Sequence, residues 1–139
     1  MDLDDFKQVN DLSGHAAGDE LLKHLAPRVK KSLRRTDLLA RIGGDEFVFF
    51  LVDVDAGYIE KITSNILRTI DSVVLEWDDG KIHRASASIG VVPAHAQSYM
   101  SYKSLYKYAD DACYQAKANG KNNVVVWSKH VPASTLYPA

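Results

Sequence analysis

The chain has 139 residues, of which 46% are hydrophobic and 25% are charged, and its formal net charge is −1 at pH 7. These values are typical of one globular domain, and the near-neutral charge argues against recruitment to nucleic acid or to a membrane surface. No apolar run approaches the ~20 residues that span a bilayer, and we expect no signal peptide. A single cysteine, Cys113, fits a reducing cytoplasm, and five histidines without cysteine partners argue against zinc.

The apolar pattern predicts strands that alternate with helices. In chain order, we expect a strand end at 1–4, a helix over 6–12 that breaks at Gly14, and a longer helix over about 17–33 interrupted by Pro27. Hairpin strands at 38–42 and 46–52 follow, and then a helix over about 56–74 and a turn at 78–80. The last predicted elements are a strand at 85–92, a loop at 94–102, a helix that ends near Gly120, and a strand at 124–127. This order predicts an α/β (α+β) fold with a βαββαβ core. We expect one domain over residues 1–127 and a loose tail over 128–139.

The most informative segment is 41–47, which reads Arg-Ile-Gly-Gly-Asp-Glu-Phe between two apolar runs. Gly43 and Gly44 predict a tight hairpin turn, because glycine reaches positive φ without strain. Asp45 and Glu46 add two carboxylates beside bare backbone, which is what a Mg-nucleotide site requires. A plain surface turn remains the alternative explanation.

A second acidic cluster opens the chain, with aspartates at positions 2, 4 and 5. In the structural interpretation, Asp4 or Asp5 caps the helix that begins near Phe6. In the functional interpretation, Asp2 ends a strand and supplies a carboxylate that faces Asp45.

Five motifs in this order resemble the GGDEF domain family, the diguanylate cyclases, over residues 2 to about 127. They are D-L-D-D-F-K-Q-V-N-D at 2–11, G-H-A-A-G-D at 14–19, R-I-G-G-D-E-F at 41–47, S-I-G-V at 88–91 and A-D-D-A-C-Y-Q-A-K-A-N-G-K-N at 109–122. The resemblance implies a palm-like nucleotidyl-cyclase fold with a central, mostly antiparallel sheet. It also implies that the hairpin turn lies next to the end of the first strand.

The resemblance implies that two GTP molecules condense into cyclic di-GMP and two pyrophosphates, in a homodimer with one GTP on each protomer. Two Mg²⁺ ions, with Mn²⁺ as a substitute, would bind Asp2, the Leu3 carbonyl and Asp45. Glu46 would be a ligand of the second metal or a proton acceptor. Paired metals would neutralise phosphate charge and lower the pKa of the attacking hydroxyl.

Further positions match the family's GTP-binding residues. Asn10 and Asp19 match its guanine readers, and the backbone N–H groups at Phe6 and Lys7 would meet the terminal phosphates. Without the resemblance, Asn10 is a helix-end residue and Asp19 a first-turn helix acid.

Lys117 and Lys121 match the basic pair that holds the triphosphate. The same residues also suit an ordinary helix C-terminus with Gly120 as its cap. The family more often has arginine at the second position, so Lys121 keeps the charge without the bidentate fork and weaker GTP affinity is expected.

Arg34 and Asp37 match the family's inhibitory site, where an Arg-x-x-Asp motif holds cyclic di-GMP. By charge alone, this segment is a solvated basic helix end. An arginine that stacks on and forks onto guanine and phosphate fits the inhibitory site.

Only Met1 precedes Asp2, whereas the family has several apolar strand residues and a helix there, as well as a sensory or dimerising region. We therefore expect a domain that lacks the start of its first strand and has modest stability and weak turnover. Two other functions remain open. One is a catalytically weak or inactive module that binds GTP or cyclic di-GMP and regulates a partner domain. The other is a nucleotidyl cyclase with another base preference, which Asn10 and Asp19 disfavour.

Overall fold

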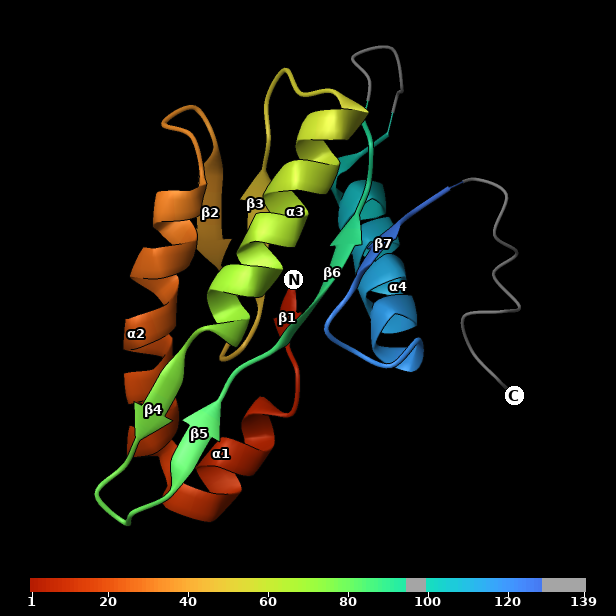
Figure 1. The fold of residues 1–139 in the computed structure, drawn as a ribbon. Helices are drawn as coiled ribbons and strands as arrows, with labels where there is room; N and C mark the ends of the chain where they lie inside the picture. Colours follow the sequence, from red (N-terminus) through yellow and green to blue (C-terminus); the bar gives the residue numbers. More distant parts are fainter. Residues whose placement is uncertain (95–99, 129–139) are drawn as a thin grey trace, which may run out of the picture. The chain divides into compact units, whose positions relative to one another are not determined.

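Helices and strands alternate along the chain, and the computed structural model describes residues 1–94 and 100–128 (Figure 1). Two units form, Met1–Ala87 and a second from Ser88 onward. The first contains β1 (Asp2–Leu3), α1 (Phe6–Ser13), α2 (His15–Ser32), β2 (Leu38–Arg41), β3 (Phe47–Phe50), α3 (Ala56–Asp71), β4 (Val74–Glu76) and β5 (Ile82–Arg84); then follow β6 (Ala87–Val91), α4 (Tyr102–Ala118) and β7 (Val124–Val126). The predicted loop at 94–102 lies partly outside the described residues, and the predicted tail at 128–139 does so almost entirely.

The first two helices meet at a glycine corner. Gly14 has a φ of +87°, which a side chain would strain, and its N–H donates to the Asn10 carbonyl at 2.8 Å. The predicted break is therefore confirmed, although α2 begins at His15, two residues earlier than expected. Leu21, Leu25 and Val29 are buried at a spacing of four residues, and Pro27 lies inside α2 without ending it.

The predicted hairpin of β2 and β3 is present and antiparallel. Its register runs from Leu38 opposite Phe50 to Arg41 opposite Phe47. The Phe47 side chain is only 2% exposed and anchors the inner face of the hairpin.

A second hairpin, β4–β5, was not predicted. The helix expected to reach residue 74 ends at Asp71, because the next apolar residues form β4, in which Leu75 pairs with His83 of β5. Gly80, with a φ of +78°, allows the chain to reverse. The hairpin lies beside α1 in Figure 1, and hydrogen bonds described below join the two.

In the second unit, β6 and β7 pair in parallel, with Ile89 opposite Val124. At Gly90 the strand passes so close to α4 that a Cβ would meet the Ala109 carbonyl and the Cys113 amide. Cys113 is buried on α4, and its thiol donates to the Ser88 carbonyl at 3.2 Å.

The prediction of a mixed α+β fold is confirmed. The pairs β2–β3 and β4–β5 and the bridge between Asp2 and Glu46 are antiparallel, whereas β6–β7 is parallel. Within 1–94 and 100–128, no helix is both long and apolar enough to cross a bilayer.

Candidate functional site

The turn that joins β2 to β3 is closed by short backbone bonds. The Ile42 N–H donates to the Glu46 carbonyl at 2.9 Å, and the Glu46 N–H donates to the Gly43 carbonyl at 3.4 Å. The Arg41 Nε donates to the carbonyls of Gly43 and Gly44 at 3.2 and 3.0 Å, so this side chain, whose role was not predicted, braces the turn from one side.

The start of the chain pairs with the end of this turn. The Leu3 N–H donates to the Asp45 carbonyl at 3.0 Å, and the Phe47 N–H donates to the Met1 carbonyl at 2.8 Å. Asp2 and Glu46 therefore form an antiparallel bridge of the non-hydrogen-bonded kind, in which side chains lie on one face and Cα atoms approach to about 4.5 Å. The start of the chain therefore lies beside the turn, as expected, but Glu46 and not Asp45 is directly opposite Asp2. That the Asp2 carboxylate faces that of Asp45 stays a prediction.

This donor set fits magnesium. Like charges opposite each other in a strand pair are unfavourable, and a divalent cation between them removes that cost. Among residues 1–94 and 100–128, no group of three or more His, Cys, Asp or Glu side chains is gathered as a metal cage. Magnesium needs no such cage, because one or two carboxylates and substrate phosphates complete its shell.

The reason given for the two turn glycines was wrong. The described glycines with positive φ are Gly14, Gly80 and Gly120, so neither Gly43 nor Gly44 needs glycine for its backbone conformation. A Cβ on Gly43 would lie 3.5 Å from Glu46 Oε2, an ordinary contact, and a Cβ on Gly44 would meet no described atom within 4 Å. The fold therefore leaves open space beside the backbone at Gly44, which suits the close approach of a ligand, while the Glu46 side chain lies beside Gly43.

Asn10 and Asp19 lie where α1 packs on α2. A Cβ on the buried Gly18 would collide with Asn10 Oδ1 and come within 3.0 Å of Phe6 Cζ, so the Asn10 amide rests directly on the glycine. Asp19 follows on α2 and is exposed. The two predicted guanine readers thus come from helices that touch at this point, and the contact with Gly18 was not predicted.

A family model described as "Diguanylate cyclase, GGDEF domain" matches residues 1–123. The chain belongs to the GGDEF domain family. This GGDEF domain is 37% identical over 134 residues to the probable diguanylate cyclase DgcE of Escherichia coli, covering 96% of this chain and 12% of that protein. It is 37% identical over 127 residues to the cyclic di-GMP phosphodiesterase PdeB of Shewanella oneidensis, covering 91% of this chain and 15% of that protein.

The fold of this GGDEF domain matches a solved structure of the same family. The crystal structure of the diguanylate cyclase SiaD with its activator SiaC, from Pseudomonas aeruginosa, aligns with a TM-score of 0.83 and 29% identity. The alignment covers 90% of this chain and 47% of that chain. This GGDEF domain therefore spans less than half the length of each of the three proteins.

The predicted phosphate-binding residues lie at helix ends of this GGDEF domain. Phe6 is buried at the start of α1, and Lys7 is exposed, with its Nζ 3.5 Å from Asp11 Oδ2. Lys117 lies in the last turn of α4 in the second unit, and Lys121 follows Gly120 with a left-handed φ of +63°. The Lys121 N–H donates to the Ala116 carbonyl at 3.2 Å, which closes the helix as the structural interpretation of this segment expected.

Arg34 and Asp37 of this GGDEF domain come together in a cluster with a third residue, Tyr58. Asp37 is fully buried; its Oδ2 accepts from the Arg34 N–H at 2.9 Å and from the Tyr58 hydroxyl at 3.2 Å. The Arg34 guanidinium lies 4.1 Å from the centre of the Tyr58 ring and donates to the Val52 carbonyl at 3.0 Å. Tyr58 could not be foreseen, because it lies 21 positions beyond Asp37.

Electrostatics keep this cluster charged. Burial acts to raise the pKa of Asp37, but hydrogen bonds from the Arg34 backbone, the Arg34 side chain and Tyr58 outweigh it and lower that pKa below its ordinary value. The hydrogen bond with Asp37 raises the pKa of Arg34. The buried Asp37 carboxylate therefore orients the Arg34 side chain, and the half-exposed guanidinium is the part of the cluster that a ligand can reach.

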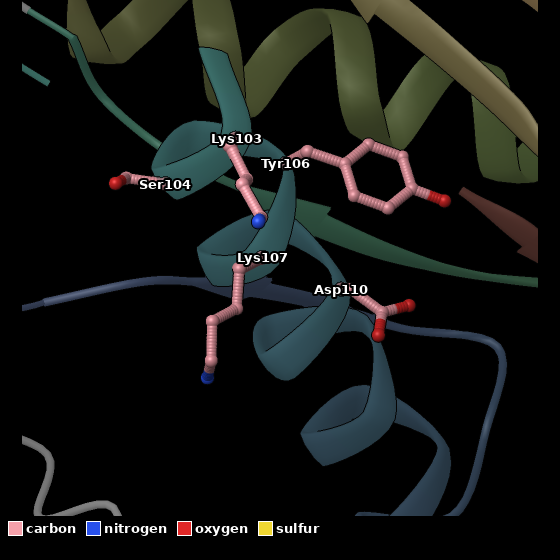
Figure 2. A pocket seen from close by; sticks show the side chains of 5 residues that line it. All are labelled: Lys103, Ser104, Tyr106, Lys107 and Asp110. Carbon is pink, nitrogen blue, oxygen red and sulfur yellow. The ribbon is translucent and has the colours of Figure 1, made fainter. Parts of the chain in front are cut away.

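An open pocket of about 470 Å³ lies on α4 and is lined by Lys103, Ser104, Tyr106, Lys107 and Asp110, whose side chains are drawn in Figure 2. None of the predicted site residues lines it. Lys107 Nζ is also bonded to Asp111 at 2.8 Å, so part of its charge is already neutralised within the helix.

Proposed function

We propose that this chain is the catalytic domain of a diguanylate cyclase, which condenses two GTP molecules into cyclic di-GMP and two pyrophosphates. The observation that carries the proposal is the Asp2–Glu46 pair, two acidic residues directly opposite each other beside a turn with open space at Gly44. Like charges directly opposite each other destabilise an ordinary strand pair, whereas a bound Mg²⁺ would offset their repulsion.

In each half-reaction, the 3′-hydroxyl oxygen of one GTP forms a bond to the α-phosphorus of the other, and the bond from that phosphorus to the bridging oxygen breaks to release pyrophosphate. Asp2, the Leu3 carbonyl and Asp45 would hold two Mg²⁺, or Mn²⁺, which supply charge neutralisation and a lower pKa for the hydroxyl. Glu46, on the same face as Asp2, accepts the hydroxyl proton or completes the metal site. The open space beside the Gly44 backbone, next to Gly43, admits the phosphates.

The base and the triphosphate are held by other residues. The Asp19 carboxylate accepts from the guanine N1–H and N2–H₂ groups, and the Asn10 amide addresses the remaining polar edge. The N–H groups at Phe6 and Lys7 bind terminal phosphates, and Lys117 and Lys121 contribute positive charge. Because one such site holds one GTP, two copies of the chain meet face to face for turnover.

Product inhibition through Arg34 is part of the proposal. Its guanidinium, held by Asp37 and stacked on Tyr58, can fork onto a phosphate or stack on a guanine of cyclic di-GMP. The support is the preformed cluster, which orients Arg34 before any ligand binds.

The test is to incubate the purified chain with Mg²⁺ and GTP and to separate the products by chromatography. Cyclic di-GMP and pyrophosphate in a 1:2 ratio are expected, with no product from ATP. Absence of product at high chain concentration, despite bound GTP, would reject the cyclase.

A second function is favoured by one observation. The same domain occurs in PdeB, whose name is that of a cyclic di-GMP phosphodiesterase. A GGDEF domain that binds GTP or cyclic di-GMP without turnover and regulates an attached domain is therefore the alternative. It predicts nucleotide binding by calorimetry with no product formed.

A further inference from the structure

A polar network outside the proposed catalytic site ties the end of α1 to the β4–β5 hairpin. The hydroxyl of Ser13, the last residue of α1, donates to Asp79 Oδ2 at 2.7 Å, and its oxygen lies 2.8 Å from His83 Nε2. Asp79 lies in the hairpin turn, and His83 is buried on β5. The three residues come from positions as far as 70 apart in sequence.

Lys81 joins the same network. Its Nζ is 2.6 Å from Asp79 Oδ2 and donates to the Leu12 carbonyl at 3.3 Å. The last turn of α1 carries no basic residue of its own. The hairpin therefore supplies the positive charge and the donor that the carbonyl end of a helix favours.

A serine, a histidine and an aspartate together can form a hydrolytic site, but the direction of the hydrogen bonds excludes one here. The side-chain hydrogen bond from Lys81 and then that from Ser13 hold the pKa of Asp79 far below its ordinary value, so Asp79 is an acceptor near neutral pH. Ser13 has one proton and gives it to Asp79, so His83 Nε2 must donate to the Ser13 oxygen. A histidine that donates to the serine cannot act as its general base, and the network holds position instead.

The position it holds is that of Asn10. Asn10 lies on the last turn of α1, and its carbonyl accepts from the Gly14 N–H at 2.8 Å, while its amide rests on Gly18 of α2. A shift of the helix end would move this amide relative to Gly18 and to the neighbouring Asp19. Guanine reading needs the amide and the carboxylate in fixed relation, because a misplaced hydrogen-bonding group is lost without compensation.

We propose that the β4–β5 hairpin is a base-specificity element. Its residues Asp79 and Lys81, together with Ser13 of α1, hold the end of α1 so that Asn10 discriminates guanine from adenine. This inference rests on the proposed function, because it requires that Asn10 and Asp19 contact the base. Ser13, Asp79, Lys81 and His83 are positioning residues that need not touch the nucleotide.

The test measures dissociation constants of 3′-deoxy-GTP and 3′-deoxy-ATP by calorimetry with Mg²⁺. Both lack the attacking hydroxyl, so binding is separated from turnover. Ser13→Ala should weaken 3′-deoxy-GTP binding roughly three- to tenfold, the range for one lost hydrogen bond, and should change 3′-deoxy-ATP binding much less. Ser13→Thr, which keeps the hydroxyl, should restore the preference. Lys81→Met, at a half-exposed position, should act in the same direction with little risk to folding.

Ser72→Ala is the matched control, because the Ser72 hydroxyl donates to the Thr69 carbonyl at 2.7 Å at the end of α3. It should leave both constants unchanged. An unchanged guanine preference in folded Ser13→Ala and Lys81→Met, or an equal loss for both nucleotides, overturns the inference while the proposed function stands. If the unmodified chain shows no preference for 3′-deoxy-GTP, the proposed base site itself fails, and this inference fails with it.

Discussion

Gly18→Ala should separate stability from nucleotide binding. Alanine in a helix interior is favoured over glycine by about 1 kcal/mol. The new methyl group would meet Asn10 Oδ1 and lie 3.0 Å from Phe6 Cζ, and overpacking of this kind costs about 1–3 kcal/mol. The sum is a loss of roughly 0–2 kcal/mol, and its lower end applies if the Asn10 amide swings away.

The displacement of the Asn10 amide is expected to weaken guanine binding. An Asn10 amide turned away from Gly18 no longer addresses guanine, so GTP affinity should fall roughly tenfold, at the upper end of the range for one lost hydrogen bond. Urea unfolding followed by circular dichroism gives the stability change, and calorimetry with 3′-deoxy-GTP gives the affinity. Both measurements are needed, because the reasoning requires that affinity falls in a variant that is still folded.

Gly57→Ala is the matched control. It is also a helical glycine, and its Cβ would meet only Asp55 Oδ1, at an ordinary 3.5 Å. It should leave GTP affinity unchanged. Tight GTP binding by a stable Gly18→Ala variant would refute the reasoning, since Asn10 would then not need its place on Gly18.

Three further predictions concern the turn and the Arg34 cluster. Asp45→Asn should lower cyclic di-GMP formation roughly a hundredfold or more with an unchanged melting temperature, as followed by chromatography, because it removes charge where phosphate charge develops. Arg34→Ala should abolish cyclic di-GMP binding in calorimetry and lower the melting temperature by a few degrees, because buried Asp37 loses the two hydrogen bonds from the Arg34 side chain. The lowered pKa of Asp37 means that its contribution to stability is present above its unfolded value and is lost as pH falls through its folded pKa, so acid unfolding should be shallower in Asp37→Asn.

Each has a result that would contradict it. Normal product formation by Asp45→Asn would remove the metal assignment. Equal cyclic di-GMP affinity before and after Arg34→Ala would remove the inhibitory site. An acid-unfolding profile identical to that of the unmodified chain for Asp37→Asn would show that Asp37 is not the group that titrates.

Local patterns allowed the main elements to be predicted, and long-range contacts could not be. The β2–β3 hairpin followed from two apolar runs around Gly43 and Gly44, yet the reason offered for the glycines was wrong, because their φ values depend on how the turn closes. The β4–β5 hairpin was missed although Asp79-Gly80 between β-branched runs is a hairpin signal. The preceding helical periodicity, which reached Ile70, extended the predicted helix to residue 74, where β4 begins, and the predicted turn at 78–80 was left without a strand before it.

In the candidate site too, some features could be predicted from the sequence and others depend on long-range contacts. That Asp2 lies beside the turn was expected from the resemblance, but its direct partner Glu46 depends on strand register, which no short motif specifies. Tyr58 beneath Arg34 and His83 beside Ser13 join segments 21 or more positions apart. A single sequence carries no signal for such pairs, because each residue alone suits an ordinary helix or strand.

The close contact of β6 with α4 at Gly90 makes Cys113 a natural probe of local opening in the second unit. The only thiol of the chain is buried on α4 and bonded to the Ser88 carbonyl, so a thiol reagent can reach it only when this part of the second unit opens. The rate of labelling in native buffer therefore measures the free energy of that opening without any engineered probe. If this free energy equals that of global unfolding in urea, the two units unfold as one cooperative body, and a smaller value means that they unfold separately. A slower labelling rate with added nucleotide would mean that the nucleotide stabilises the second unit.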